Sequence, residues 1–221
     1  MRYHAEYGAF RRGRNAMWRL AVMLVTLAAL IRPAAGEAAA IRLLAFGDSL
    51  TAGYNLPPDA AFPAQLEQAL KAKGLDISVI NAGVSGDTTA GALSRLDWAL
   101  ADRPTHALVA LGANDMLRGL PPEQAAANLD AIVVRLQQAG VKVMLAGMRA
   151  APNLGADYGR RFEGLYPEIA ARRQVPLYPF FLDGVAAVPK LNLDDGMHPN
   201  RAGIAVIVKH MLPQILGFLG R

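Results

Sequence analysis

The chain has 221 residues, of which 53% are hydrophobic and 19% are charged, and it contains no cysteine. This composition excludes a disordered chain, a disulfide scaffold and a thiol nucleophile. The net charge of +5 comes mostly from residues 1–40, which hold six of the 23 basic and two of the 18 acidic residues, so the nearly neutral remainder predicts no nucleic-acid partner.

Residues 1–40 have the parts of a secretory signal peptide, in the expected order. A basic stretch, Arg11–Arg19, precedes a mostly apolar run without charges, Leu20–Ile31, and small residues then lead to Ala38–Ala40. We expect cleavage near Ala40 and a periplasmic or secreted mature chain that begins near Ile41. An uncleaved anchor is the alternative, although the run is shorter than the roughly 20 residues that span a bilayer. Met17 is an alternative start of the same leader.

Residues 41–221 alternate short apolar runs with longer amphipathic stretches. The apolar runs are expected strands: Ile41–Phe46, Ile77–Asn81, Ala107–Leu111, Val141–Ala146 and Val175–Tyr178. The amphipathic stretches are expected helices: Phe62–Lys73, Thr88–Ala101, Pro121–Ala139, Tyr158–Arg173 and Asn200–Leu219. Strands separated by helices favour right-handed crossovers, so we expect one α/β domain of three layers, with a five-stranded parallel sheet between two layers of helices.

Ligands of such a domain bind beyond the carboxyl ends of the strands. Polar and small residues follow the first four expected strands and also precede the last expected helix. These segments are 47–50 (GDSL), 81–88 (NAGVSGDT), 112–115 (GAND), 148–149 (MR) and 194–199 (DDGMHP). We therefore look for the chemistry of the protein among them.

Three of these residues have the types that nucleophilic acyl transfer requires. Ser49 follows the first strand in a turn of small residues, where a serine is also typical of a helix N-cap. His198 is the strongest candidate for the base, and Asp195 is three residues earlier, so its carboxylate is placed to bond one imidazole nitrogen and leave the other for Ser49. Pro199 is typical of the first position of a helix, which predicts that the imidazole lies near a positive helix end.

An oxyanion that forms during acyl transfer needs hydrogen-bond donors. The candidates are the backbone N–H of Gly86, the side-chain amide of Asn114 and the backbone N–H of Ser49. Taken singly, Gly86 is typical of a loop and Asn114 of an Asx turn. Their occurrence together, at one edge of the predicted sheet, favours an acyl-transfer site.

Two other kinds of site use the same segments. The Gly47–Gly53 loop resembles a phosphate-binding turn of a flavodoxin-like carrier, but Asp48 would repel the anion and the loop has no Walker lysine. Asp194, Asp195 and His198 are possible metal ligands, but one histidine and two adjacent carboxylates are a small set. We therefore expect neither a metal nor a cofactor.

The motifs resemble those of the GDSL, or SGNH, hydrolases, and in particular the bacterial group of multifunctional acyl-CoA thioesterase I, lysophospholipase and arylesterase proteins. The likeness extends over residues 41–221 and is carried by segments 46–54 (FGDSLTAGY), 85–88 (SGDT), 114–119 (NDMLRG), 158–161 (YGRR) and 194–200 (DDGMHPN). It implies a flavodoxin-like, doubly wound fold. It also implies a catalytic triad and an oxyanion hole, which would be Ser49, Asp195 and His198, and Ser49, Gly86 and Asn114.

The resemblance further implies a hydrolase without a cofactor, which cleaves aryl esters, acyl thioesters and lysophospholipids through an acyl-enzyme. With the expected leader, this predicts an exported enzyme that has at most transient membrane contact. The resemblance also implies a mobile loop at residues 116–121 beside an acyl groove, whereas the longer stretch 150–156 departs from the group. We expect Leu117, Leu120 and Leu154 to contact the acyl chain, with ordinary loop packing as the alternative. A carbohydrate O-deacetylase on the same scaffold and a non-catalytic flavodoxin-like binding module are the alternative functions.

Overall fold

A computed structural model describes residues 41–221. The expected leader, residues 1–40, lies outside this range, so the signal peptide and its cleavage stay predictions. None of the helices within the described range is long and apolar enough to cross a membrane.

The described residues form one parallel sheet of five strands in the order β2-β1-β3-β4-β5. The strands are β1 (Ile41–Gly47), β2 (Ile77–Gly83), β3 (His106–Ala110), β4 (Lys142–Ala146) and β5 (Leu177–Tyr178). The order reverses between β1 and β3, which is the point where ligands of flavodoxin-like sheets bind. The predicted fold class is therefore confirmed.

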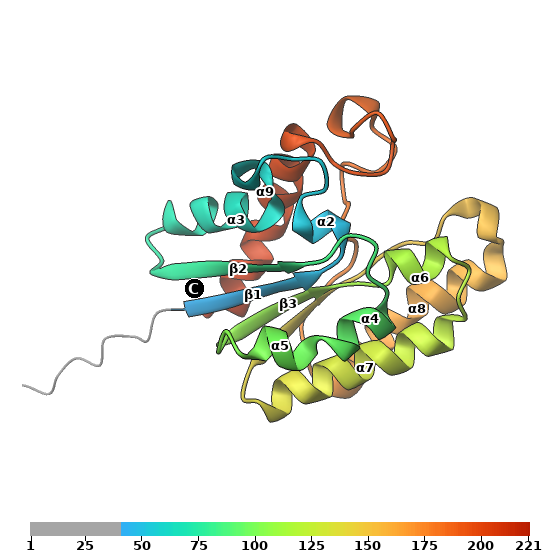
Figure 1. Ribbon diagram of the computed structural model, residues 1–221, viewed down its shortest axis with the longest axis horizontal. Helices are drawn as coiled ribbons and strands as arrows, with labels where there is room; N and C mark the ends of the chain where they lie inside the picture. Colours follow the sequence, from blue (N-terminus) through green and yellow to red (C-terminus); the bar gives the residue numbers. More distant parts are fainter. Residues whose placement is uncertain (1–40) are drawn as a thin grey trace, which may run out of the picture. The chain divides into compact units, whose positions relative to one another are not determined.

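Helices cover both faces of this sheet, and they lie between the strands in the sequence. They are α2 (Ser49–Ala52), α3 (Phe62–Lys71), α4 (Thr89–Ser94), α5 (Leu96–Leu100), α6 (Ala113–Leu117), α7 (Pro122–Gln138), α8 (Ala156–Arg173) and α9 (Arg201–Phe218). Short 3-10 turns occur at Pro58–Ala60, Pro152–Leu154 and Pro189–Leu191. Figure 1 shows α3 and α9 on one face of the sheet and α4, α5, α7 and α8 on the other.

The core lies between the sheet and these two layers. All of β3 is buried, as is β1 from Leu43 onward, because a parallel sheet with helices on both faces hides both sides of each central strand. Large aromatic side chains complete the core, and those that are almost completely buried are Phe46, Phe62, Phe162, Tyr166 and Phe181.

Two expected elements differ from those observed. The expected helix 88–101 is divided into α4 and α5 at Arg95, whose backbone leaves the helical region at φ −103° and ψ 6°. The expected strand 175–178 begins only at Leu177, because the N–H of Val175 bonds back to the carbonyl of Ala170 and Pro176 has no N–H. Neither difference moves a segment away from the edge where the polar residues gather.

Candidate active site

The turn after β1 places Ser49 at the first residue of α2. β1 ends at Gly47, where an added Cβ would lie 2.1 Å from Thr51 Oγ1, so this close approach requires glycine. Asp48 caps α2, because its carboxylate accepts the backbone N–H of Leu50 at 3.0 Å. The sharp turn presents the Ser49 side chain at the carboxyl edge of the sheet.

Ser49, His198 and Asp195 form a continuous chain of polar contacts. His198 Nε2 lies 3.0 Å from Ser49 Oγ, and His198 Nδ1 lies 2.7 Å from Asp195 Oδ2. The other carboxylate oxygen of Asp195 accepts the backbone N–H groups of His198 and Met197 at 2.9 Å each. These backbone bonds lower the pKa of Asp195 to about 2. An ionised Asp195 requires a proton on Nδ1, which leaves Nε2 free to accept the proton of the hydroxyl.

The loop that carries His198 is held by bonds of its own backbone and by packing. The N–H of Leu193 donates to the carbonyl of His198 at 2.7 Å, and the amide of Asn192 donates to the carbonyl of Val185 at 2.9 Å. The ring of Tyr54 lies against the imidazole, with centroids 4.4 Å apart. The imidazole is therefore oriented before a substrate arrives.

Pro199 is not the first residue of the last helix, and that prediction was wrong. α9 begins at Arg201, and Asn200 is its N-cap, whose side-chain oxygen accepts a backbone N–H of the first turn at 3.0 Å. The chain can start the helix later because Asn200, unlike Pro199, satisfies one of the free N–H groups at its beginning. The tautomer of His198 follows from its contact with the carboxylate rather than from a helix end.

The expected oxyanion donors line the same cavity as Ser49 and His198. Gly86 has a φ of +80°, and its carbonyl accepts a hydrogen bond from Arg118 at 2.7 Å, which fixes the peptide between Gly86 and Asp87. Asn114 lies in α6, and its amide nitrogen is 3.4 Å from Asp48 Oδ2. The structure thus brings together residues from the ends of three neighbouring strands and from the loop before α9.

The sequence profile of the GDSL-like lipase/acylhydrolase family matches residues 45–206. The chain belongs to this family. It is therefore an enzyme of the hydrolase class, and the predicted resemblance is confirmed.

Relatives and solved structures agree with this assignment. An arylesterase of Vibrio mimicus is 40% identical over 179 residues, which are 80% of this chain and 90% of the relative. Thioesterase 1/protease 1/lysophospholipase L1 of Escherichia coli strain K12 is 40% identical over 179 residues, which are 80% of this chain and 85% of the relative. The crystal structure of TesA has a TM-score of 0.77 at 36% identity and covers 80% of this chain and 99% of its own. The psychrotrophic esterase EstA from Pseudoalteromonas sp. has a TM-score of 0.77 at 35% identity and covers 81% and 99%.

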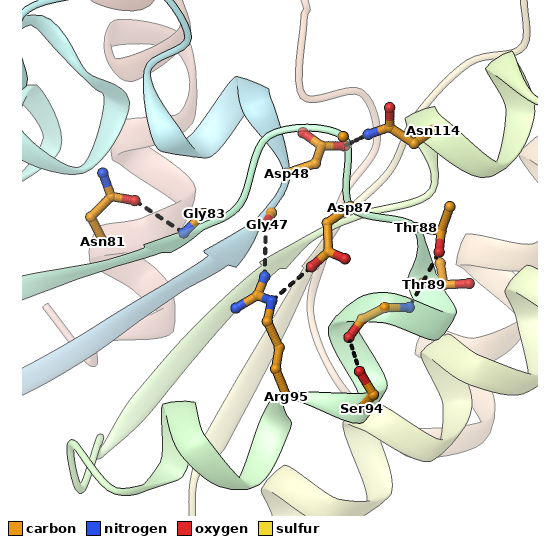
Figure 2. A network of polar contacts seen from close by, with 12 residues as sticks. Gly47, Asp48, Asn81, Gly83, Asp87, Thr88, Thr89, Ser94, Arg95 and Asn114 are labelled. Atoms are coloured by element: carbon orange, nitrogen blue, oxygen red, sulfur yellow. Dashed lines mark hydrogen bonds and ion pairs between the residues drawn. The ribbon is translucent and has the colours of Figure 1, made fainter.

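Asp48 of the GDSL motif is a buried carboxyl group, with 1% of its surface exposed. Burial raises the pKa of Asp48 from 3.8 to about 6, although the bond from Leu50 and the nearby His198 oppose this effect. Figure 2 shows its carboxylate directed at the amide of Asn114. In the hydrolase, Asp48 thus connects the turn that carries Ser49 to helix α6, which carries Asn114.

A second polar contact joins the same turn to the loop after β2. The guanidinium of Arg95 bonds the carboxylate of Asp87 at 2.7 Å and the carbonyl of Gly47 at 3.0 Å (Figure 2). It also lies over the ring of Phe46, 4.5 Å from the centroid. Arg95 therefore holds Gly47, at the end of β1, against Asp87, in the loop after β2.

A cavity of about 540 Å³ opens beside Ser49, and most of its wall is apolar. Besides alanines, its large apolar lining residues are Leu50, Tyr54, Met116, Leu117, Met148, Phe180, Leu182 and Met197. Three of them, Tyr54, Leu117 and Met197, are among the exposed large hydrophobic residues of the described chain. The hydrolase thus presents an apolar hollow at its candidate nucleophile.

Of the three leucines expected to contact an acyl chain, only Leu117 lines this cavity. Leu120 closes the turn between α6 and α7, where its N–H bonds the carbonyl of Asp115 and its carbonyl accepts the hydroxyl of Tyr158, each at 2.9 Å. Leu154 packs against the core from a 3-10 turn. Neither Leu120 nor Leu154 is among the residues that line the cavity.

Sequence reasoning missed Tyr54, Phe180, Leu182 and Met197 as lining residues. They lie in irregular segments, where no hydrophobic period indicates which side chains point inward. The one sequence signal for such lining residues is their position, because Tyr54 follows α2 and Phe180 follows β5 at the sheet edge that carries Ser49. Within residues 41–221, no group of three or more histidine, aspartate or glutamate side chains is placed to hold a metal ion.

Proposed function

We propose that the protein is an exported serine hydrolase that cleaves carboxylic esters and thioesters through an acyl-enzyme. The observation that carries this proposal is the contact chain from Ser49 through His198 to Asp195, at 3.0 and 2.7 Å. Both ring nitrogens of His198 are engaged in it, one as donor and one as acceptor. This is the arrangement that general-base activation of a hydroxyl requires.

The reaction proceeds in two halves at the same serine. Ser49 Oγ attacks the acyl carbonyl carbon while His198 Nε2 takes the hydroxyl proton, and the tetrahedral intermediate collapses as that proton passes to the leaving oxygen or sulfur. A water molecule then attacks the acyl-enzyme, again losing its proton to His198, and Ser49 regains a proton as the carboxylic acid departs. Asp195 remains an anion throughout and stabilises the imidazolium.

The negative charge on the carbonyl oxygen is received by three donors, the N–H groups of Ser49 and Gly86 and the side-chain amide of Asn114. Asp48 and Arg118 support this role, because the first bonds the amide of Asn114 and the second bonds the carbonyl of Gly86. Donors fixed in advance need no reorganisation when the charge develops, which is the main source of their effect on rate.

Aryl esters, acyl thioesters and lysophospholipids are the proposed substrates. The apolar lining near Ser49, including Leu117 and Met197, suits an acyl chain of several carbons. The named activities of the Vibrio mimicus and Escherichia coli relatives agree with this choice. EstA is described as inhibited by monoethylphosphonate, and phosphonates imitate the tetrahedral intermediate of acyl transfer. A carbohydrate O-deacetylase, the alternative, would need a more polar wall.

The test is steady-state kinetics on p-nitrophenyl acetate, butyrate, octanoate and decanoate and on the matching acyl thioesters, with Ser49→Ala as the control. We expect kcat/KM to rise with chain length beyond acetate and Ser49→Ala to lose at least 10³-fold. Retention of activity in Ser49→Ala would overturn the mechanism, and a maximum at acetate would favour the deacetylase.

We also propose that residues 1–40 are a leader cleaved near Ala40 and that residues 41–221 are the hydrolase domain. Ile41 is the first residue of β1 and pairs with Ile77, so cleavage there would leave a strand at the mature N-terminus and remove nothing from the sheet. N-terminal sequencing of the protein recovered from the periplasm or medium tests this. We expect a start at or near Ile41, and a recovered chain starting at Met1 or Met17 would overturn the proposal.

A further inference from the structure

The wall of the active cavity carries one arginine and, among the residues that the structure describes, no aspartate or glutamate. That arginine is Arg149, and His198 is the other basic residue in the lining. Arg149 is exposed to solvent, but no acidic lining residue offsets its charge, so it favours an anion at this side of the cavity.

The surroundings of Arg149 leave its donors free. Its guanidinium carbon lies 4.8 Å from the centroid of the Phe180 ring, so the charged group rests on an aromatic face. Within residues 41–221 the side chain makes no hydrogen bond or ion pair, whereas Arg95, Arg161 and Arg173 each pair with a carboxylate. A guanidinium that stacks on a ring keeps its in-plane N–H groups available for a ligand.

The backbone around Arg149 is held on both sides. The N–H of Gly147 bonds the carbonyl of Tyr178 at 2.8 Å, and the N–H of Ala151 bonds Met116 Sδ at 3.1 Å. The nearby carboxylate of Glu163 accepts the N–H of Ala150 at 3.1 Å and forms no ion pair with Arg149. The backbone on both sides of Arg149 is therefore held in the loop just after β4, at the same sheet edge as Ser49.

We propose that Arg149 is an anion subsite of the active cavity, which recognises a phosphate or carboxylate carried by the ester or thioester substrate. The guanidinium binds two oxygens of such a group through parallel N–H bonds, while the neighbouring apolar wall holds the acyl chain. This inference rests on the proposed function of Ser49 and adds a preference for anionic substrates. The anion has two chemical sources, a phosphate on the leaving group or a carboxylate at the far end of the acyl chain.

The experiment compares matched neutral and anionic substrates in the parent and in Arg149→Gln and Arg149→Lys. One pair is p-nitrophenyl octanoate and the p-nitrophenyl monoester of octanedioic acid, which places a carboxylate on the acyl chain. The other pair is 1-lauroylglycerol and 1-lauroyl-lysophosphatidic acid, which places a phosphate on the leaving group. Lys209→Gln, which removes an exposed charge from α9, is the charge-matched control.

We expect Arg149→Gln to lower kcat/KM about tenfold, mainly through KM, for at least one anionic substrate and to leave its neutral partner within twofold. Arg149→Lys should recover part of the loss, and Lys209→Gln should change none of the ratios. The pair that responds identifies the source of the anion. Added salt should weaken the preference, because an exposed cation is screened.

Two results would overturn the subsite. Equal losses on neutral and anionic substrates would mean that Arg149 only packs against Phe180, and no loss on either would mean that it has no role in recognition. Both are distinguishable from failure of the proposed function, in which Ser49→Ala would keep the parent activity on the neutral esters.

Discussion

Asn114 connects the oxyanion site to the buried Asp48, because its amide nitrogen is 3.4 Å from that carboxylate. We predict that Asn114→Ala lowers kcat by about 10²–10³, the usual effect of losing one oxyanion donor, and leaves KM much less changed. Kinetics with p-nitrophenyl octanoate measures both constants. Hydrolysis by the variant at the parent rate would remove Asn114 from the oxyanion site.

Asp195 holds both the imidazole and the turn before it. In Asp195→Asn the remaining side-chain oxygen can still accept the N–H groups of Met197 and His198, but the amide no longer favours the proton on Nδ1. We predict a loss in kcat of about 10³–10⁴. A decrease of less than tenfold would contradict the triad.

The pH dependence of the parent separates Asp195 from the other groups. Its pKa is lowered to about 2, so the carboxylate stays ionised throughout the range from pH 4 to 9. Any acid limb of activity in that range therefore belongs to another group. The Asp195→Asn variant should keep an acid limb, moved to lower pH because the negative charge that favours the protonated form of a neighbouring base is gone. A limb that disappears in this variant would show that Asp195 itself titrates there.

Asp48 makes the protein less stable as the pH rises, whereas a surface carboxylate in an ion pair makes it less stable as the pH falls. Its pKa rises from 3.8 to about 6 because it is buried, so the folded state holds the proton more tightly than the unfolded state. Its contribution to stability is greatest below pH 3.8 and is lost as the pH rises through 6. Relative to the parent, Asp48→Asn should therefore gain up to about 3 kcal/mol in free energy of unfolding between pH 4 and 7.

Urea unfolding of both proteins at several pH values measures this gain. A difference between them that stays constant from pH 4 to 7 would contradict the burial effect. The same variant should lose activity, because an amide in place of the carboxylate offers Asn114 one acceptor fewer.

At the scale of elements, Arg95 ties the end of β1 to the loop before α4. The side chains of Arg95 and Asp87 are only 18% and 11% exposed, so Arg95→Met leaves a carboxylate with little access to water. We predict a loss of about 2–3 kcal/mol in free energy of unfolding and a lower kcat. The matched control is Arg135→Met, which breaks an exposed pair with Asp97 and should cost less than about 1 kcal/mol. Equal losses in the two variants would contradict the role of Arg95.

Elements with a clear pattern of hydrophobic residues were predictable from the sequence, and the shortest helices were not. The apolar runs at 41–46 and 107–111 correspond to β1 and β3, because a strand buried on both faces needs apolar side chains at every position. The four-residue α2 and five-residue α6 were not expected, since one turn of helix is too short to show a period. The division at Arg95 depends on contacts with Asp87 and Gly47 that only the folded chain brings together.

At the scale of the whole molecule, the candidate site was more predictable than the cavity around it. The topology of a parallel sheet brings strand ends to one edge, so Ser49, Gly86 and Asn114 could be grouped from their places in the sequence. The lining could not be derived in this way, because Leu120 and Leu154 lie outside it while Phe180 and Met197 come from irregular loops. Side-chain direction in such loops depends on backbone bonds that no residue pattern encodes.

The central claim is that Ser49 is the nucleophile and that His198 activates it. The most direct test is labelling of the folded protein with a fluorophosphonate, followed by intact mass measurement and peptide mapping. The account predicts one adduct, on Ser49, that is absent in Ser49→Ala and at least 10²-fold slower to form in His198→Ala. An active protein that is not labelled, or one labelled equally well without Ser49, would contradict it.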